Sequence, residues 1–199
     1  MIAIKNLSTA KPYSEFSKFY QDALNKNQLN VEAIVISSFN PIKKEVESRY
    51  VNLKYITNEE WIFFSNYNSK KATDFKMHEQ VSILLYWNSI NVQIRMKANI
   101  QKTKDEFSNQ HFNSRSKEKN ALAISSDQSS IIDSYELVKT NFQNTLSSSD
   151  QLYKRPSYWG GYSFSPYYFE FWQGHESRLN KRDVYEMQSN EWLHYKLQP

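Results

Sequence analysis

The chain contains 199 residues, no cysteine and three glycines, and it carries a formal net charge of +4 at pH 7. This length fits one domain. The lack of cysteine excludes disulfides, thiolate metal sites and cysteine nucleophiles. The glycines, Gly160, Gly161 and Gly174, all lie near the C-terminus, so neither a Rossmann fingerprint nor a P-loop can be present.

The composition is that of a folded globular protein. Hydrophobic residues make up 39% of the chain and charged residues 23%, close to the usual range, and the 16% aromatic content argues against disorder. The mild positive charge fits an anionic small molecule and does not indicate a nucleic-acid partner. No apolar stretch has the length of a membrane span, and residues 1–10 lack the apolar segment of a secretory signal. We therefore expect a cytoplasmic protein with no membrane partner.

The first predicted element is a helix over about residues 13–27, which follows Pro12 and has Ser14 as its expected cap. Its apolar side chains recur at helical spacing: Phe16, Phe19, Tyr20, Ala23 and Leu24.

Five strand-like runs follow, over residues 33–39, 49–56, 61–65, 81–87 and 91–100. Val51, Leu53 and Tyr55 are expected on one face of the second run, opposite Asn52 and Lys54. The fifth run alternates most clearly, with apolar residues on one face and polar residues, Gln93 among them, on the other. A short helix over residues 69–77 separates the third run from the fourth.

The pattern then becomes helical over residues 105–112, 117–124 and 133–146, which predicts a helical insertion over about residues 104–146. Residues 147–150 are expected to form a loop. Strands return over residues 167–172, 184–187 and 192–197. Many short strands interrupted once by helices predict a mainly β fold with α-helices (α+β). We expect an antiparallel β-barrel with flanking helices, formed as a single domain over residues 1–199.

Basic and hydroxyl side chains gather around the second and third strand runs. Arg49 and Lys54 lie near the ends of a strand, and Lys70 and Lys71 begin the helix just after Ser65. Such groups at a helix N-terminus favour a phosphate; the alternative is a set of solvated surface charges.

A second polar segment contains Gln128, Ser129 and Ser130. These residues could cap the helix that begins near Asp133, or they could supply hydroxyl groups to an anion. Sequence alone leaves both interpretations open.

Two segments near the C-terminus combine glycine, aromatic and basic residues. The pair Gly160 and Gly161 allows backbone torsions that other residues resist, and its alternative role is a tight turn that leads into a strand. Trp172 precedes Arg178 and Arg182, an arrangement that can stack on a planar ligand and bind its anionic groups. The alternative is a core tryptophan with two surface arginines.

The histidines offer no metal or triad pattern. His78, His111, His175 and His194 lack metal-ligand spacing, and no Ser-His-Asp arrangement can be recognised. We predict no metal site and expect each histidine to be structural or exposed.

Taken in order, these segments resemble the pyridoxine (pyridoxamine) 5′-phosphate oxidase family over about residues 12–199. The motifs that carry the resemblance are RYVNLK at 49–54, FFSNYNSKKA at 63–72, QSS at 128–130, PSYWGG at 156–161, FWQG at 171–174 and RLNKR at 178–182. Each motif is weak alone, but the ordered set is specific.

The resemblance implies a split antiparallel β-barrel that forms a homodimer, with FMN in two symmetric clefts between the subunits. The implied FMN contacts are Arg49, Tyr50, Val51, Asn52, Leu53, Lys54, Phe64, Ser65, Lys70, Lys71, Gln93, Gln128, Ser129, Trp172 and Arg182. The implied contacts with a phosphorylated pyridine substrate are Lys54, His111, Arg115, Lys119, Arg178 and Asn180, with Arg178 as the catalytic residue.

Three of these substrate positions depart from the family pattern. His111 stands where the family has tyrosine, Lys119 where it has serine and Asn180 where it has histidine. The G-x-P that usually precedes the first FMN-binding strand is also missing. The flavin site is therefore better supported by the sequence than the substrate.

The resemblance implies an FMN-dependent oxidase that makes pyridoxal 5′-phosphate from pyridoxine or pyridoxamine 5′-phosphate, with O2 as the acceptor, in vitamin B6 biosynthesis. The departures motivate two alternatives: a related split-barrel FMN oxidoreductase with another substrate, and a non-catalytic protein that binds flavin or pyridoxal phosphate. A nucleic-acid binder is the weakest hypothesis, since it rests only on the mild charge and the aromatic content.

Overall fold

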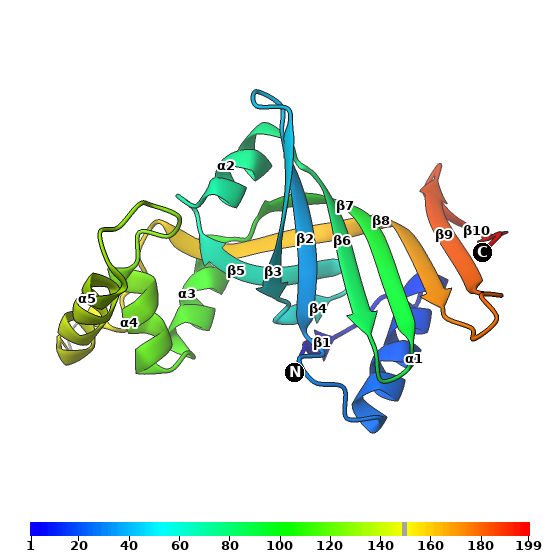
Figure 1. Cartoon of the computed structure of the whole chain (residues 1–199), viewed down its shortest axis with the longest axis horizontal. Coiled ribbons are helices and arrows are strands. Elements are labelled where there is room, and N and C mark those ends of the chain that lie inside the picture. Colours follow the sequence, from blue (N-terminus) through cyan, green and yellow to red (C-terminus); the bar gives the residue numbers. More distant parts are fainter. Residues whose placement is uncertain (149–150) are drawn as a thin grey trace.

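The computed structural model describes residues 1–148 and 151–199. In this part of the chain, ten strands join in one sheet, accompanied by five α-helices (Figure 1). In chain order the elements are β1 (Ala3–Lys5), α1 (Lys11–Asn25), β2 (Ala33–Asn40), β3 (Glu45–Asn52), β4 (Tyr55–Thr57), β5 (Glu60–Asn66), α2 (Lys70–Met77), β6 (Gln80–Trp87), β7 (Val92–Lys102), α3 (Asp105–Asn113), α4 (Lys117–Ser125), α5 (Tyr135–Ser147), β8 (Trp159–Gln173), β9 (Lys181–Gln188) and β10 (Glu191–Leu197).

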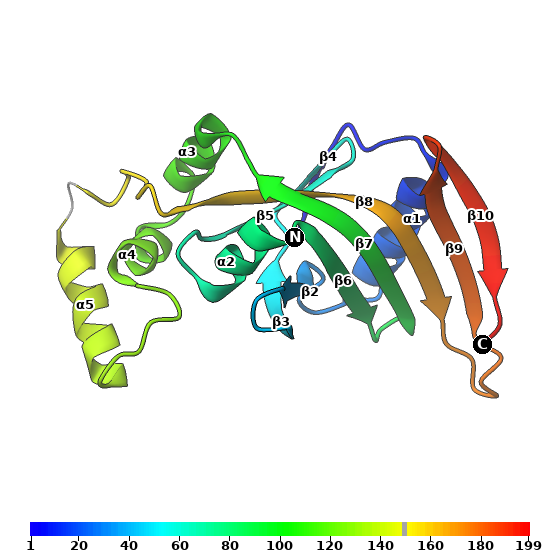
Figure 2. The same ribbon diagram turned by 90° about the horizontal axis from the view of Figure 1, so that it is seen from above.

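The sheet has the strand order β1-β4-β5-β8-β7-β6-β2-β3. Its pairs are antiparallel except for β1 with β4, which is parallel. The end strand β3 continues after only two residues into β4, which lies next to the opposite end strand, β1. The sheet therefore curls into a barrel, and β9 and β10 extend from β8 outside it (Figure 2).

The link between β3 and β4 corrects one prediction. A single strand over residues 49–56 was expected, but the chain turns a corner at Leu53 and Lys54. The Leu53 N–H donates to the Glu32 carbonyl beside β2, whereas the Lys54 N–H donates to the Ile62 carbonyl in β5. The corner buries the Leu53 side chain completely.

Helix α1 covers one end of the barrel with an aromatic face, as its spacing predicted. Phe16 meets Trp61 edge to face, with 4.4 Å between ring centroids, and Tyr13 meets Phe169 in the same way at 5.3 Å. The expected cap is wrong: Ala10 is the N-cap, and the Ser14 hydroxyl donates to the Lys11 carbonyl inside the first turn.

Strand β8 begins eight residues earlier than predicted and contains the glycine pair. Neither glycine has a positive φ, so the expected turn or unusual torsion is absent there. The reason is space: a Cβ on Gly160 would overlap the Tyr67 hydroxyl and lie 2.7 Å from its Cζ, and one on Gly161 would lie 2.5 Å from Thr103 Oγ1. Glycine lets neighbouring side chains pack against the strand.

Left-handed backbone positions are occupied mainly by asparagine. Six of the ten non-glycine residues with positive φ in the described chain are Asn6, Asn27, Asn30, Asn58, Asn91 and Asn190. Asparagine tolerates this region better than other side chains, which explains how the chain makes its turns with so few glycines.

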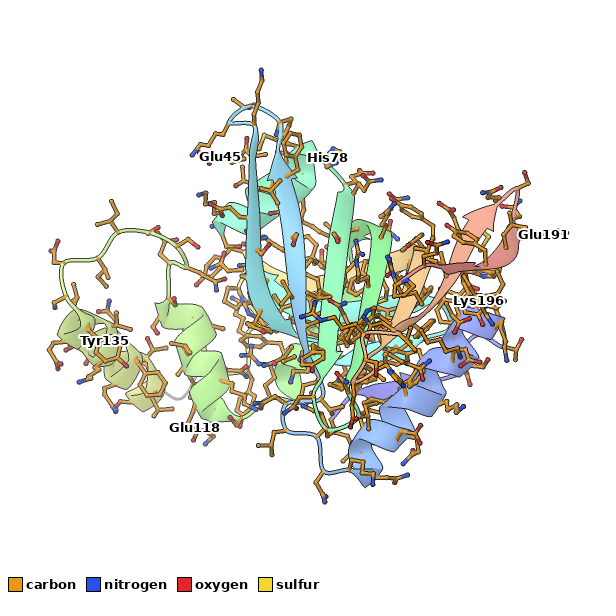
Figure 3. The ribbon with its side chains drawn as sticks, turned by 45° about the vertical axis from the view of Figure 1, so that its right-hand side comes forward. Glu45, His78, Glu118, Tyr135, Glu191 and Lys196 are labelled. Atoms are coloured by element: carbon orange, nitrogen blue, oxygen red, sulfur yellow. The ribbon has the colours of Figure 1, made fainter. Side chains whose placement is uncertain are left out.

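Helices α3, α4 and α5 occupy the segment predicted as a helical insertion, and α4 and α5 stand apart from the barrel (Figures 1 and 2). Glu118 on α4 and Tyr135 on α5 are labelled there in Figure 3. The cap of α5 is the Ser134 hydroxyl, which accepts from the Leu137 N–H, so the 128–130 segment does not cap this helix. Of the loop expected over 147–150, Ser147 ends α5, and 149–150 lie outside the described residues. Among described residues, no helix is both long and apolar enough to cross a membrane.

Candidate functional site

A pocket of about 710 Å³ opens between the β3 and β5 strands of the barrel and the helices α2, α3 and α4. Its lining residues are Glu47, Arg49, Tyr50, Val51, Asn52, Lys54, Phe64, Ser65, Asn66, Lys70, Lys71, His111, Arg115, Lys119, Leu122, Ala123, Ser126, Gln128, Ser129 and Trp159. The pocket thus brings together residues from the 49–54, 63–72 and 128–130 motifs.

The first cationic cluster of the pocket consists of Arg49, Lys70 and Lys71. Lys71 is 8% exposed, and among the described residues its ammonium group contacts only neutral oxygens: Ser69 Oγ at 3.0 Å, Ser65 Oγ at 3.2 Å and Gln128 Oε1 at 3.4 Å. Burial, assisted by the positive charge of Arg49, lowers the pKa of Lys71 to about 8.

A buried ammonium group without a carboxylate partner favours an anionic ligand, because burying an unpaired charge is costly. The donors available here are an ammonium, a guanidinium and hydroxyl groups, which suit a phosphate. The phosphate end of a flavin nucleotide therefore fits the chemistry of this cluster.

Arg49 is held by a network that reaches into the protein. Its Nη1 donates to Ser38 Oγ at 2.7 Å, and the Ser38 hydroxyl donates to Asp74 Oδ2 at 2.8 Å. Asp74 is 1% exposed and also accepts from Asn40 Nδ2 at 2.9 Å. The network fixes the guanidinium through Ser38, and Arg49 lines the pocket.

Glu47 lies on the same face of β3 as Arg49 and was not predicted as a site residue. Its carboxylate accepts from Arg49 Nη2 at 3.2 Å and from the Lys70 ammonium group. These two cations lower the pKa of Glu47. The carboxylate therefore occupies donors that a phosphate would use. The period-two spacing from residue 49 was the signal that could have identified it.

The second cationic cluster consists of Lys54, Arg115 and Lys119. The Arg115 guanidinium lies 4.3 Å above the Trp159 ring, and its Nη2 donates to the Lys119 carbonyl at 2.8 Å. Its Nη1 is buried without a hydrogen-bond partner among the described residues. Burial lowers the pKa of Arg115 to about 10. An unsatisfied buried cationic donor again favours an anion.

Stacked rings form a wall between the strands and α3. Phe64 stacks on His111 with 3.7 Å between centroids and on Trp159 at 5.3 Å. Burial, together with the charges of Arg115, Lys54 and Lys119, lowers the pKa of His111 to about 4. His111 is therefore a neutral imidazole near pH 7. Trp159 belongs to the PSYWGG motif but was not predicted to contact a ligand.

Three predicted cofactor contacts lie elsewhere on the protomer. Gln93 pairs with Trp172 across β7 and β8, and Trp172 pairs with Arg182 across β8 and β9. We call these three residues the lateral row. Arg182 Nε donates to Glu170 Oε1 at 2.8 Å, and Arg95 Nη1 donates to Oε2 of the same carboxylate at 3.1 Å. Glu170 is 2% exposed, so the two arginines neutralise a buried charge.

Arg178 and Asn180 lie in the loop between β8 and β9, next to the lateral row. The Asn180 Oδ1 accepts from the His175 N–H at 3.1 Å, and Arg178 has a positive φ of 59°. Ser129 is the other predicted site residue in the left-handed region, with φ at 78°. Strained backbone of this kind concentrates at functional sites.

The structure thus divides the predicted site residues into separate groups. The pocket collects Arg49, Tyr50, Val51, Asn52, Lys54, Phe64, Ser65, Lys70, Lys71, His111, Arg115, Lys119, Gln128 and Ser129. The lateral row and its loop hold Gln93, Trp172, Arg178, Asn180 and Arg182 outside it. Leu53 is fully buried and does not line the pocket.

Comparison with protein families gives two matches. Residues 21–147 match the family described as pyridoxamine 5′-phosphate oxidase, and residues 159–199 match the pyridoxine 5′-phosphate oxidase C-terminal dimerisation region. The first match covers the pocket, apart from Trp159, and the second covers the lateral row except for Gln93.

Curated relatives carry the same family name. Pyridoxine/pyridoxamine 5′-phosphate oxidase 1 of Hydrogenovibrio crunogenus is 33% identical over 175 residues, which cover 88% of this chain and 81% of the relative. A pyridoxine/pyridoxamine 5′-phosphate oxidase of Leptospira interrogans is 32% identical over 190 residues, which cover 94% and 88%.

Solved structures share the fold. PhzG from Burkholderia lata, determined in complex with tetrahydrophenazine-1-carboxylic acid, superposes with a TM-score of 0.90 at 23% identity, covering 96% of this chain and 93% of PhzG. A pyridoxamine 5′-phosphate oxidase-related, FMN-binding protein from Nostoc punctiforme gives a TM-score of 0.77 at 12% identity, covering 96% and 100%. These neighbours confirm the expected split-barrel fold.

Proposed function

The chain belongs to the pyridoxamine 5′-phosphate oxidase family, and on this premise we propose that it is an FMN-dependent oxidase. It converts pyridoxine or pyridoxamine 5′-phosphate to pyridoxal 5′-phosphate with O2 as the electron acceptor. The observation that carries the proposal is one pocket with two separate cationic clusters, each holding a buried cation without an anionic partner among the described residues.

The first cationic cluster would hold the phosphate of FMN. Lys71 and Arg49 face the pocket with their charges already positioned by Ser65, Ser69 and Ser38. Gln128 and Ser129 close this end from the loop after α4. When bound, FMN supplies the two-electron acceptor that no side chain of the protein can provide.

The second cationic cluster would bind the phosphate of the substrate. Arg49 and Lys54 are five residues apart, at most about 17 Å in extended chain, so one strand and its corner connect both clusters. Arg115 offers a desolvated guanidinium, and Lys54 and Lys119 add charge beside it. The stacked rings of Phe64, His111 and Trp159 form the wall on this side of the pocket.

The reaction oxidises the carbon attached to the pyridine ring. With pyridoxamine 5′-phosphate, O2 and water are consumed, and aldehyde, ammonia and hydrogen peroxide are produced; with pyridoxine 5′-phosphate, the alcohol becomes the aldehyde without loss of ammonia. The chain's own contribution is to bind the phosphate, orient the ring and keep water away. Arg178 orients the reacting end of the substrate.

Each complete site takes residues from two subunits in this proposal. The lateral row and Arg178 lie outside the pocket of their own protomer, although the family resemblance assigns them to the same ligands. The match of residues 159–199 to a dimerisation region supports a homodimer in which these residues face the partner's pocket.

The test uses purified protein with its bound flavin. The visible spectrum should be that of a flavin, pyridoxamine 5′-phosphate should bleach it in the absence of oxygen, and aldehyde should form under air. A flavin spectrum with neither bleaching nor aldehyde, for either phosphorylated substrate, would refute the oxidase assignment.

A second candidate keeps FMN and changes the substrate. Lys119 and Asn180 alter charge and hydrogen bonding at substrate positions, and the second cationic cluster would accept a carboxylate as well as a phosphate. In that case flavin bleaching should occur with another planar anionic donor and not with the pyridoxine compounds. A panel of planar carboxylates tested by anaerobic bleaching distinguishes the two candidates.

A further inference from the structure

Tyr55 lies behind the pocket wall and contacts two of the residues that form it, Phe64 and His111. Its hydroxyl oxygen is 2.8 Å from Nδ1 of His111. His111 lines the pocket, whereas Tyr55 does not. The imidazole therefore has Nδ1 bonded to Tyr55, and its Nε2 has no hydrogen-bond partner among the described residues. The 49–56 pattern gave no hint of this pair, since its partner lies 56 residues away.

The geometry of both rings is fixed by aromatic packing. Tyr55 meets Phe64 at 6.2 Å, Phe107 at 5.3 Å and His111 at 5.4 Å between centroids, each close to edge to face. Phe107 and His111 are one turn apart on α3, so the helix presents both to Tyr55. The imidazole is also stacked flat on Phe64. Neither ring can rotate without breaking several of these contacts.

The protonation states favour one direction for the bond. Burial raises the pKa of Tyr55, so its hydroxyl keeps its proton. The low pKa of His111 makes the imidazole neutral, with a single N–H. The Tyr55 hydroxyl has no other hydrogen-bond partner among the described residues, so its proton is used only if it donates to Nδ1. The single N–H of His111 then lies on Nε2.

From this geometry we infer that Tyr55 is a positioning residue, which holds His111 as the Nε2–H tautomer and directs that N–H toward the anionic group of the substrate. The inference rests on the proposed function for the identity of the anion. Tyr55 touches no ligand itself. His111 thereby contributes a neutral donor among the charges of Lys54, Arg115 and Lys119, and it adds no further positive charge to the pocket.

The tautomer can be measured without any turnover. In protein labelled with isotopic nitrogen in histidine, His111 Nε2 should show the chemical shift of a protonated nitrogen at neutral pH and Nδ1 that of an acceptor. The His111→Gln variant assigns the signal. A protonated Nδ1, or an imidazolium at neutral pH, overturns the inference even if the enzyme oxidises its substrate normally.

The variant Tyr55→Phe keeps the ring and removes the hydroxyl. It should convert His111 to a mixture of tautomers and raise KM for pyridoxamine 5′-phosphate about three- to ten-fold, with kcat nearly unchanged, as expected for one hydrogen bond. Tyr195→Phe is the matched control, because its hydroxyl bonds to Glu186 on the β9–β10 hairpin. The control should alter neither the tautomer nor KM.

Two further measurements separate positioning from a structural effect. In a His111→Gln background, where the amide supplies its own donor, Tyr55→Phe should cause no additional rise in KM. If neither pyridoxine compound is turned over, titration with inorganic phosphate replaces KM: its dissociation constant should rise in Tyr55→Phe and not in Tyr195→Phe. Equal binding by wild type and Tyr55→Phe overturns the inference, whereas absent turnover alone refutes only the proposed substrate.

Discussion

The Lys71 ammonium group lies 3.2 Å from the hydroxyl of Ser65, and both side chains are more than nine-tenths buried. Burial lowers the pKa of Lys71 from 10.5 to about 8. Between these two values the unfolded chain holds a proton that the native protein has lost. The free energy of unfolding of the flavin-free protein should therefore increase as pH rises from about 8 to 10.5, because of this residue.

Flavin binding should show the opposite pH dependence. The charged ammonium attracts the phosphate, so FMN affinity should fall as pH rises above about 8. In Lys71→Met this dependence should be absent and FMN affinity at neutral pH should fall about ten-fold or more. Fluorescence titration of flavin-free protein at several pH values measures both. A wild-type pH profile in the variant would contradict the assigned role.

Glu47→Gln should bind FMN more tightly than wild type. The carboxylate engages Arg49 and the Lys70 ammonium group and would repel a phosphate beside them. Removing the charge should lower the dissociation constant about three- to ten-fold. Glu45→Gln is the control, since Glu45 is an exposed residue on the same strand. Weaker binding in Glu47→Gln would mean that Glu47 holds the two cations in place for the ligand.

Arg182→Ala should weaken FMN retention and also destabilise the protein. The substitution removes one of two arginines that neutralise the buried Glu170, and stranding a buried charge costs several kcal/mol in unfavourable cases. Arg95→Ala separates the two effects, because Arg95 pairs with the same carboxylate from an exposed position. The melting temperature should be lower in both variants than in the wild-type protein. Flavin should be lost on dialysis only from Arg182→Ala, and equal retention would count against its cofactor role.

Asn180→His should raise turnover with pyridoxine 5′-phosphate. The family resemblance places a histidine at this position, beside the reacting end of the substrate. The Asn180 amide now accepts from the His175 N–H within the β8–β9 loop, so the substitution also removes a local bond. Steady-state kinetics should show a higher kcat. An unchanged or lower kcat would show that the loop and site are adapted to asparagine.

Gly160→Ala should destabilise the barrel by about 1–3 kcal/mol through overpacking. The new methyl group would overlap the Tyr67 hydroxyl and lie 2.7 Å from Cζ. Because the glycine φ is not positive, the cost comes from space and not from torsion. Gly160→Ala should lower the melting temperature less in a Tyr67→Phe background than in the wild-type protein. Absence of any recovery would locate the strain elsewhere.

The sequence predicts best where one periodicity runs through a whole element. On β7, residues Val92, Ile94 and Met96 are buried while Arg95 and Lys97 are exposed, so the alternation matches the two faces of the strand. Helix α1 is equally clear because its aromatic residues all face the barrel. In both elements the local pattern and the tertiary packing agree.

The pattern fails where tertiary contacts change without a change in residue type. At Leu53 and Lys54 the alternation continues while the chain transfers from β2 to β5, so nothing local marks the corner. The first half of β8 reads as a glycine-rich turn, although Tyr67 and Thr103, distant in sequence, are the reason for its glycines.

For the site residues too, the sequence predicts local motifs better than contacts between distant elements. Motif resemblance identified Lys71 and Arg115, which the structure brings to one pocket. It gave no indication of Glu47, whose importance comes from the cations beside it, or of Tyr55, which acts through a residue on α3. Such contacts depend on which elements meet, and a single sequence does not specify that.

Strand β8 has a consequence for mixed assemblies of subunits. Trp159 and Trp172 lie at its two ends, about 40 Å apart at the usual rise per residue, so one chain cannot place both in a single cleft. If each cleft combines one protomer's pocket with its partner's lateral row, Lys71→Ala and Arg182→Ala damage opposite halves. Reassembling equal amounts of the two variants would leave one undamaged cleft in each mixed dimer. With random pairing, about half of the dimers would be mixed. About a quarter of all clefts would then be undamaged, whereas neither variant alone has an undamaged cleft.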